Sequence, residues 1–215
     1  MMHDLLESES FKKLEQEYKF LSRAREQVYQ LENDDFVILD TETTGLDPAN
    51  SEIIEIAALK VKNKEIVDIF NHLVKPANPI PDNITKINGI TNEMVEESPT
   101  LGNITYKFLD FIGGSTLMMH NAEFDLSFIN HHIFTPRKKE LGSPSICTLK
   151  VSRFVLPQLQ SHKLSSLAQH FGIPVKNSHR ALGDVETTFE LWFKLTPLLR
   201  DKGISTCEDL LKAIP

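Results

Sequence analysis

Short runs of apolar residues, each followed by polar residues, recur along the chain and predict the strands of a buried sheet. The first run, residues 36–39, is too short for a lone helix and fits a strand covered on both faces. Residues 53–62 and 65–75 follow with short connections, so the first three strands should form an antiparallel meander. Two more strands are predicted at 116–119 and 146–148.

Apolar residues spaced three and four apart predict helices between and after these strands. One is expected at 99–112, with Ser98 as its candidate N-cap and Gly113-Gly114 as its stop. Another should open at Asp125, and the loop at 84–91 should contain a short helical turn. The remaining helices are predicted at 162–171, stopped by Gly172-Ile173-Pro174, and from the region of Asp184 through Leu195.

The N-terminal residues 10–31 predict an amphipathic helix. Its stripe could pack on the protein's own domain. It could instead dock a protein partner, because the spacing also suits a short coiled coil. Both interpretations stay open on the sequence. The apolar residues of the stripe are Phe11, Leu14, Tyr18, Leu21 and Val28.

Composition narrows the class of protein. A chain of 215 residues with 40% hydrophobic and 25% charged residues predicts one packed domain with appendages, not a disordered protein. Neither a membrane span nor a secretory signal is visible, so a cytoplasmic location is expected. Cys147 and Cys207 lack metal-ligand spacing. The net charge of −7 argues against a broad basic surface for nucleic acid, although not against a local one.

Acidic residues stand where predicted strands end or helices begin. Because side chains alternate along a strand, Asp40 and Glu42 should project from one face about 7 Å apart and share cations. Asp125 follows the strand at 116–119, where open α/β sheets place their chemistry. His179 and Asp184 would point about 140° apart on a continuous helix. They can therefore meet only if His179 lies on the loop before that helix.

Each of these residues also has a plain structural explanation. Asp-x-Glu is common in an acidic chain, so Asp40 and Glu42 could be a solvated strand end. Asp125 could cap a helix and complement its dipole. A lone histidine on a loop, such as His179, is usually just solvated. Only the complete set favours chemistry.

The set occurs in three ordered motifs, Asp40-Thr-Glu-Thr-Thr-Gly45, His120-Asn-Ala-Glu-Phe-Asp125 and His179-Arg-Ala-Leu-Gly-Asp184. These motifs resemble those of the DEDDh branch of the DnaQ-like 3'-to-5' exonucleases, which includes the proofreading subunit of bacterial replicative DNA polymerase. The resemblance implies a ribonuclease H-like α/β fold, with a mixed central sheet flanked by helices. It divides the chain into an N-terminal helical extension (1–33), an exonuclease domain (34–197) and a C-terminal helical tail (198–215).

The resemblance also implies release of nucleoside monophosphates from a 3' end with two divalent metal ions, Mg²⁺ or Mn²⁺. Asp40, Glu42, Asp125 and Asp184 would be the metal ligands, and their hard oxygens suit Mg²⁺. Two cations held by four carboxylates are nearly neutral, which reconciles an acidic protein with a nucleic-acid substrate. His179 would be the general base, because an imidazole with an ordinary pKa of about 6.5 suits that role.

Other positions fall where the family contacts the terminal nucleotides. Thr44 adds a hydroxyl at the mouth of the site. Asn88 stands where the family often has histidine, so it can hydrogen-bond a sugar or phosphate without carrying a charge. The further expected substrate contacts are Thr43, Leu46, His120 and Phe124.

Single-stranded DNA with a free 3' end is the favoured substrate, and no membrane partner is expected. One alternative is an RNA-trimming exoribonuclease of the same superfamily, because two-metal chemistry does not itself read the 2'-hydroxyl. Another is a weakly catalytic module that mainly binds a polymerase or other complex through its N-terminal helix. The intact acidic set counts against that module. No polymerase-like region is apparent, so proofreading would require a separate partner.

Overall fold

The computed structural model describes residues 31, 34–139, 141–175 and 179–214. Apart from Leu31, the helix predicted at 10–31 lies outside the described residues.

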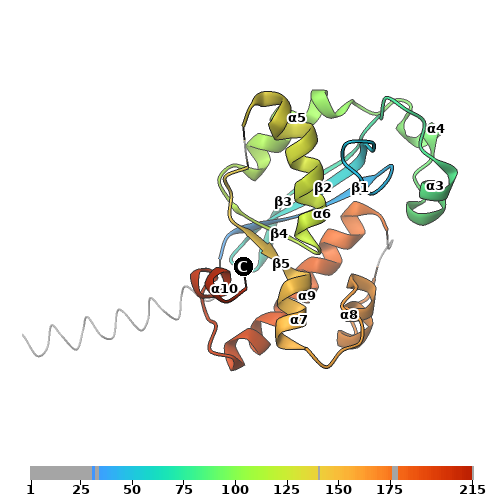
Figure 1. The fold of residues 1–215 in the computed structure, drawn as a ribbon. Coiled ribbons are helices and arrows are strands. Elements are labelled where there is room, and N and C mark those ends of the chain that lie inside the picture. The colour runs from blue at the N-terminus through green and yellow to red at the C-terminus, as the bar shows by residue number, and fades with distance from the viewer. Residues whose placement is uncertain (1–30, 32–33, 140, 176–178, 215) are drawn as a thin grey trace, which may run out of the picture.

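Five strands form one mixed sheet with the order β3-β2-β1-β4-β5 (Figure 1). β1 pairs antiparallel with β2, and β2 pairs antiparallel with β3, which confirms the predicted meander. On its other side β1 runs parallel to β4, and β4 runs parallel to β5. The strands are β1 (Phe36–Thr43), β2 (Ile53–Lys62), β3 (Glu65–Leu73), β4 (Thr116–Met119) and β5 (Ser145–Cys147).

Helices cover both faces of the sheet, and each face has its own apolar core. On one face Val37 and Leu39 pack with α5 (Leu101–Ile112) and α6 (Ala122–Ile129). On the other face Phe36 and Ile38 pack with the remaining large helices (Figure 1). Those helices are α7 (Thr148–Val155), α8 (Leu164–Phe171), α9 (Ala181–Asp201) and α10 (Cys207–Ala213). The predicted mixed sheet flanked by helices is confirmed.

Short helical elements connect the strands and the larger helices. Ile54, Ile80, Ile90 and Val95 form a third apolar cluster beneath two short helices. Gly89 ends the first of them in the left-handed conformation, with φ of 73°, which glycine adopts without strain. The short elements are α3 (Asp82–Asn88), α4 (Asn92–Val95), a π-helix (Asn130–Phe134) and a 3₁₀ turn (Thr135–Arg137).

Several predicted helix ends were wrong. α5 begins after Thr100 rather than after Ser98, because Asn103 Oδ1 accepts hydrogen bonds from both the backbone and the hydroxyl of Thr100. α6 begins three residues before Asp125, after Asn121 in the left-handed conformation. α9 continues past Leu195 to Asp201.

One further difference and one observation concern the second half of the chain. α7 was not predicted, although its buried residues Val151 and Val155 are spaced four apart. Within the predicted C-terminal tail, Leu199, Ile204 and Leu210 belong to the core on the α9 face of the sheet.

No helix in the described part of the chain is long and apolar enough to cross a membrane.

The alternation of β1 assigns its last residues to different faces. Because Phe36 and Ile38 face α9, Asp40 and Glu42 lie on that same side of the strand. Thr41 lies on the opposite side, the side of α6, as Val37 and Leu39 do. The end of β1 thus presents different groups to two helices.

Trp192 of α9 should be a main contributor to stability. It is fully buried and meets Phe36 edge-to-face, with ring centroids 6.1 Å apart. We expect Trp192→Ala to lower the free energy of unfolding by roughly 3–5 kcal/mol in urea denaturation. Val67→Ala on half-exposed β3 is the control and should change it by about 0.5 kcal/mol or less. If Trp192→Ala lowers the free energy of unfolding by no more than Val67→Ala does, then Trp192 is not a main contributor to the stability of the core.

Candidate active site

Three carboxylates meet beyond the end of β1. Asp40, Glu42 and Asp184 each offer an oxygen, and these atoms all lie within 4.8 Å of one another. β1 supplies the first two, and the first turn of α9 supplies the third. The pairing of β1 with β2 shifts register between Glu42 and Thr43, so the regular ladder ends at the acidic residues. The group has the donors and spacing to hold a divalent cation.

A fourth carboxylate, Asp125, approaches from the other side of β1. Its Oδ1 accepts hydrogen bonds from the backbone N–H of Thr41, at 3.0 Å, and from the Thr41 hydroxyl, at 2.8 Å. The Asp125 side chain is only 2% exposed. Both donors of Thr41 act on the same carboxylate oxygen and so fix the orientation of the Asp125 side chain.

Burial raises the pKa values of these acids, and for Asp40 and Glu42 the charges of neighbouring acids raise them further. The pKa of Asp40 lies well above its ordinary value, because of burial first and then the charges of Asp125, Glu42 and Asp184. Burial raises the pKa of Glu42 to about 7, against the opposing hydrogen bond from Asn88. Burial also raises the pKa of Asp125 to about 7, against the hydrogen bonds from Thr41. A bound cation would relieve these costs by favouring the charged carboxylates.

His179 lies outside the helix that carries Asp184, as the loop interpretation required. α9 begins at Ala181, and His179 is exposed with a left-handed backbone, φ 61°. Burial raises the pKa of Asp184, while the charge and the backbone hydrogen bond of His179 lower it. His179 and Asp184 are therefore neighbours in space.

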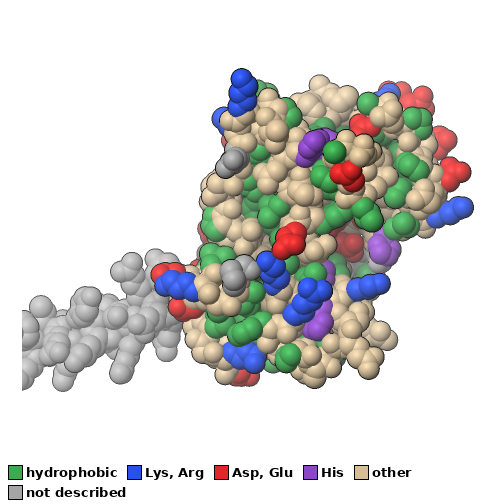
Figure 2. Space-filling model, viewed as in Figure 1, with side chains coloured by type: hydrophobic (Ala, Val, Ile, Leu, Met, Phe, Trp, Pro, Cys, Tyr) green, Lys and Arg blue, Asp and Glu red, His purple; other side chains and the backbone are tan. Residues whose placement is uncertain are grey.

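A cleft of about 1020 Å³ opens beside this group. His179 and Asp184 line it together with Leu46, which is 86% exposed in the β1–β2 loop. The opposite wall comes from α7 and the segment before α8, and it carries Arg153 and Lys163. Figure 2 shows basic and histidine side chains gathered over the region where Figure 1 places α7 and α8.

His120 lines the cleft, but both of its ring nitrogens have protein partners. Nε2 donates to the carbonyl of His162 at 2.9 Å, and Nδ1 lies 2.9 Å from the Thr148 hydroxyl. Burial lowers the pKa of His120 to about 4, so the ring is neutral. A substrate contact by His120 would thus use the ring face and carbon atoms.

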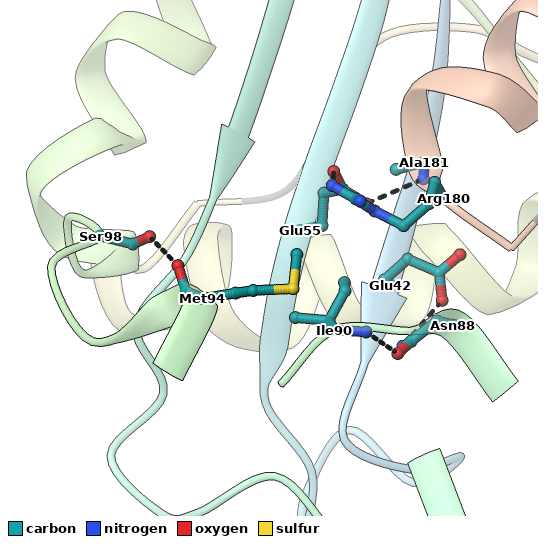
Figure 3. Close-up of polar contacts among 8 residues, drawn as sticks. All are labelled: Glu42, Glu55, Asn88, Ile90, Met94, Ser98, Arg180 and Ala181. Carbon is teal, nitrogen blue, oxygen red and sulfur yellow. Dashed lines mark hydrogen bonds and ion pairs between the residues drawn. The ribbon is translucent and has the colours of Figure 1, made fainter. Parts of the chain in front are cut away.

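The other expected substrate contacts also have internal partners. Thr43 donates to the carbonyl of Gly45, and the Thr44 hydroxyl accepts from the backbone of Glu52. Phe124 is half-buried, with its ring centroid 5.0 Å from that of Phe128. Asn88 is buried, and its amide donates to Glu42 Oε2 at 3.3 Å (Figure 3). Asn88 therefore orients a candidate metal ligand.

Two residues that the sequence analysis missed stand next to the acidic group. Glu55 of β2 is opposite Glu42 in the strand register, and it accepts a two-pronged ion pair from Arg180. Glu55 could have been noticed in the sequence, because it is a charged residue within the otherwise apolar first half of the strand Ile53–Lys62. Arg180 stood inside the third motif without an assigned role.

Comparison with known proteins agrees with this geometry. An acidic group at the end of β1, on a mixed sheet with helices on both faces, is consistent with a nuclease of the ribonuclease H-like class. The exonuclease family model RNase_T matches residues 37–192, and the chain belongs to this family. The predicted fold class and the resemblance to DnaQ-like exonucleases are thereby confirmed.

Individual relatives differ in how much of their length the chain covers. It is 39% identical over 160 residues to DNA polymerase III subunit epsilon of Aquifex aeolicus, covering 74% of this chain and 79% of that protein. It is 40% identical over 180 residues to DNA polymerase III PolC-type of Caldanaerobacter subterraneus, covering 82% of this chain. The chain spans only 12% of the length of that PolC-type protein.

A solved structure supports the fold over nearly the whole of a related chain. Exonuclease X, in complex with 5' overhanging duplex DNA, aligns with a TM-score of 0.67 and 28% identity. The alignment covers 84% of this chain and 99% of that one.

The raised pKa of Glu42 predicts a pH-dependent stability in the absence of metal. Between its ordinary value of 4.5 and about 7, the folded protein binds a proton that the unfolded chain has released. The contribution of Glu42 to stability is therefore complete below this window and is lost as pH rises through it. In EDTA, the melting temperature of wild type minus that of Glu42→Gln should fall from about pH 5 to about pH 8.

Adding Mg²⁺ at the upper pH should raise the melting temperature of wild type more than that of Glu42→Gln, because the cation binds the folded carboxylates. If the difference in melting temperature between wild type and Glu42→Gln in EDTA stays flat or rises with pH, then burial does not raise the pKa of Glu42 in the folded protein.

Proposed function

We propose that this chain is a metal-dependent 3'-to-5' exonuclease that releases nucleoside monophosphates from DNA 3' ends, with single strands favoured. One observation carries the proposal: Asp40, Glu42 and Asp184 converge beside a large cleft in a chain of the exonuclease family. The names of its relatives, a polymerase subunit epsilon and an exonuclease solved with DNA, favour DNA as the substrate.

Asp40, Glu42, Asp125 and Asp184 would hold two divalent cations, Mg²⁺ or Mn²⁺. The donors fit such ions, because all are hard carboxylate oxygens and their pKa values are raised by burial and mutual repulsion. Bound there, the cations would supply a hydroxide nucleophile and stabilise the leaving oxygen of a phosphodiester. Thr41 would keep Asp125 oriented through its two hydrogen bonds.

His179 would accept the proton of the attacking water. Its exposed position on the loop before α9 leaves the ring free to turn toward the group, while Asp184 is fixed in the helix. An imidazole accepts a proton only in its neutral form, so activity should depend on pH.

The wall of the cleft would bind the strand upstream of the cleaved bond. Arg153 and Lys163 are exposed there and can meet backbone phosphates without reading sequence. Leu46 projects from the opposite rim and could stack against or wedge between bases. Because these basic side chains are local to the cleft, the protein could bind a strand there even though its net charge is −7.

Work beside a DNA polymerase, as in proofreading, is a further part of the proposal. Its support is the naming of relatives as DNA polymerase III components. Docking by the N-terminal segment, the division at residues 33/34 and 197/198, and a cytoplasmic location remain predictions.

The metal site is tested by removing ligands. Cleavage of 5'-labelled single-stranded DNA should require Mg²⁺ or Mn²⁺ and stop in EDTA. Asp40→Ala and Asp184→Ala should each lower the rate by about 10³-fold or more, since a cation supplies several kcal/mol of transition-state stabilisation. Both variants should melt no lower than metal-free wild type, because removing one acid relieves repulsion.

Asp110→Ala, at an exposed position of α5, is the matched control and should cleave like wild type. An RNA strand of the same sequence and a DNA strand with a blocked 3' end complete the assay. Full activity in EDTA would overturn the metal mechanism. Cleavage of RNA in preference to DNA would make RNA the substrate in place of DNA. Cleavage of the blocked strand would refute the requirement for a free 3' end.

His179→Ala should lower kcat by about 10²- to 10⁴-fold and remove the rise of rate on the acid limb of the pH profile. Mn²⁺ affinity, set by the carboxylates, should change little in calorimetry. The exposed His170→Ala is the control. Loss of metal affinity in step with rate would make His179 a ligand, and an unchanged rate would make it a bystander.

Arg153→Ala combined with Lys163→Ala should raise KM for a single strand while leaving kcat nearly unchanged. The slope of log KM against log salt should become shallower by roughly 1.4, which is two phosphate contacts on a single strand. Lys107→Ala with Lys194→Ala removes the same charge from exposed positions outside the cleft and should leave both quantities near wild type. If the two double variants change KM and the salt dependence equally, then the wall of the cleft does not bind the strand and only the net charge of the protein matters.

A further inference from the structure

Glu55 is a buried carboxylate beside the acidic group, and the proposed chemistry does not use it. Its side chain is 1% exposed, whereas its partner Arg180 is one-third exposed. Glu55 accepts from Arg180 Nη2 at 2.7 Å, from Arg180 Nε at 3.0 Å and from the backbone N–H of Ala181 at 3.0 Å (Figure 3). A buried carboxylate with three donors is well satisfied and rigidly placed.

The three donors lie between the two functional residues of the third motif. Ala181 is the first residue of α9, so its N–H has no partner within the helix. Glu55 supplies that partner from a strand 126 residues away in sequence. The contact attaches the start of α9 to β2 at Glu55, the residue that pairs with Glu42 in the strand register.

His179 depends on this attachment more than Asp184 does. Asp184 is fixed within α9, where its own N–H donates to the carbonyl of Arg180 at 3.0 Å. His179 precedes the helix, and its backbone is in the left-handed conformation, which is uncommon for a residue other than glycine. The clamped residue, Arg180, follows His179 directly.

From this geometry we infer that Glu55 is a positioning residue for His179. By clamping Arg180 and the first N–H of α9, it holds the imidazole within reach of the acidic group at the end of β1. The inference rests on the proposed function, in which His179 is the general base. Glu55 itself contacts neither the substrate nor the cations.

A purely structural ion pair between β2 and α9 is the competing explanation, and the two make different predictions. A structural contact lowers stability, and any effect on rate is the same whether or not His179 is present. A positioning contact lowers the rate only while there is an imidazole to misplace. The double-mutant cycle between Glu55 and His179 separates them.

The experiment uses the full chain and measures single-stranded DNA cleavage, melting temperature and Mn²⁺ binding. Glu55→Gln keeps the shape of the side chain but loses the charge and the paired acceptor. We expect kcat to fall by about 10- to 100-fold, the usual cost of losing a group that orients a functional residue, with KM changed by less than about threefold. Mn²⁺ affinity should stay near wild type.

In the His179→Ala background the same Glu55→Gln substitution should lower kcat by less than about threefold, because the coupled groups act as one unit. Arg180→Lys keeps the positive charge while losing Nε, and it leaves the Ala181 contact in place. It should show a smaller loss than Glu55→Gln, and it serves as the test if Glu55→Gln does not fold. Leu210→Ala, buried in the core on α10, is the control for destabilisation alone. It should lower the melting temperature without lowering kcat in the cold.

Three results would overturn the inference. One is wild-type kcat in folded Glu55→Gln, or in folded Arg180→Lys if Glu55→Gln does not fold. Another is an equal loss with and without His179, which marks a structural contact. The third is a fall in Mn²⁺ affinity that accounts for the loss of rate, which assigns Glu55 to the metal site instead. Absence of cleavage by wild type is a different outcome and refutes the proposed function itself.

Discussion

Four carboxylates share the space at the end of β1, and the cost of keeping them there governs the surrounding structure. Burial and mutual repulsion disfavour their charged forms, as the raised pKa values of Asp40, Glu42 and Asp125 show. The fold must therefore hold the group rigidly from several directions. This is a common property of sites that bind cations, where stability is given up in exchange for affinity.

Three contacts restrain the group, and each comes from a different element. Thr41 donates twice to Asp125, joining β1 to α6 on one face of the sheet. Asn88 donates to Glu42 from the end of α3. Glu55 holds the start of α9, the helix that carries Asp184, on the other face. The alternation of β1 makes this possible, because neighbouring residues of one strand address both helical layers.

The strands and the convergence of Asp40, Glu42 and Asp184 could be predicted from the sequence, because they depend on local pattern and on the order of the motifs. Asp40 and Glu42 belong to one strand, and strand periodicity alone places them on one face. Helix ends were less predictable, since Thr100 and Asn121 begin α5 and α6 through side-chain geometry and a left-handed backbone. Glu55 was not singled out, and Asn88 was expected to contact the substrate rather than Glu42, because the partners of both residues are distant in sequence and meet them only in the folded chain.

His120 has a mechanical consequence for the cleft. Its imidazole bridges the end of β4 to Thr148 on α7 and to the carbonyl of His162 before α8. If that wall moved away from the sheet, the ring would lose two part-buried hydrogen bonds, each worth about 0.5–1.5 kcal/mol. The wall that bears Arg153 and Lys163 is thus tied to the sheet through one imidazole ring, which resists widening of the cleft.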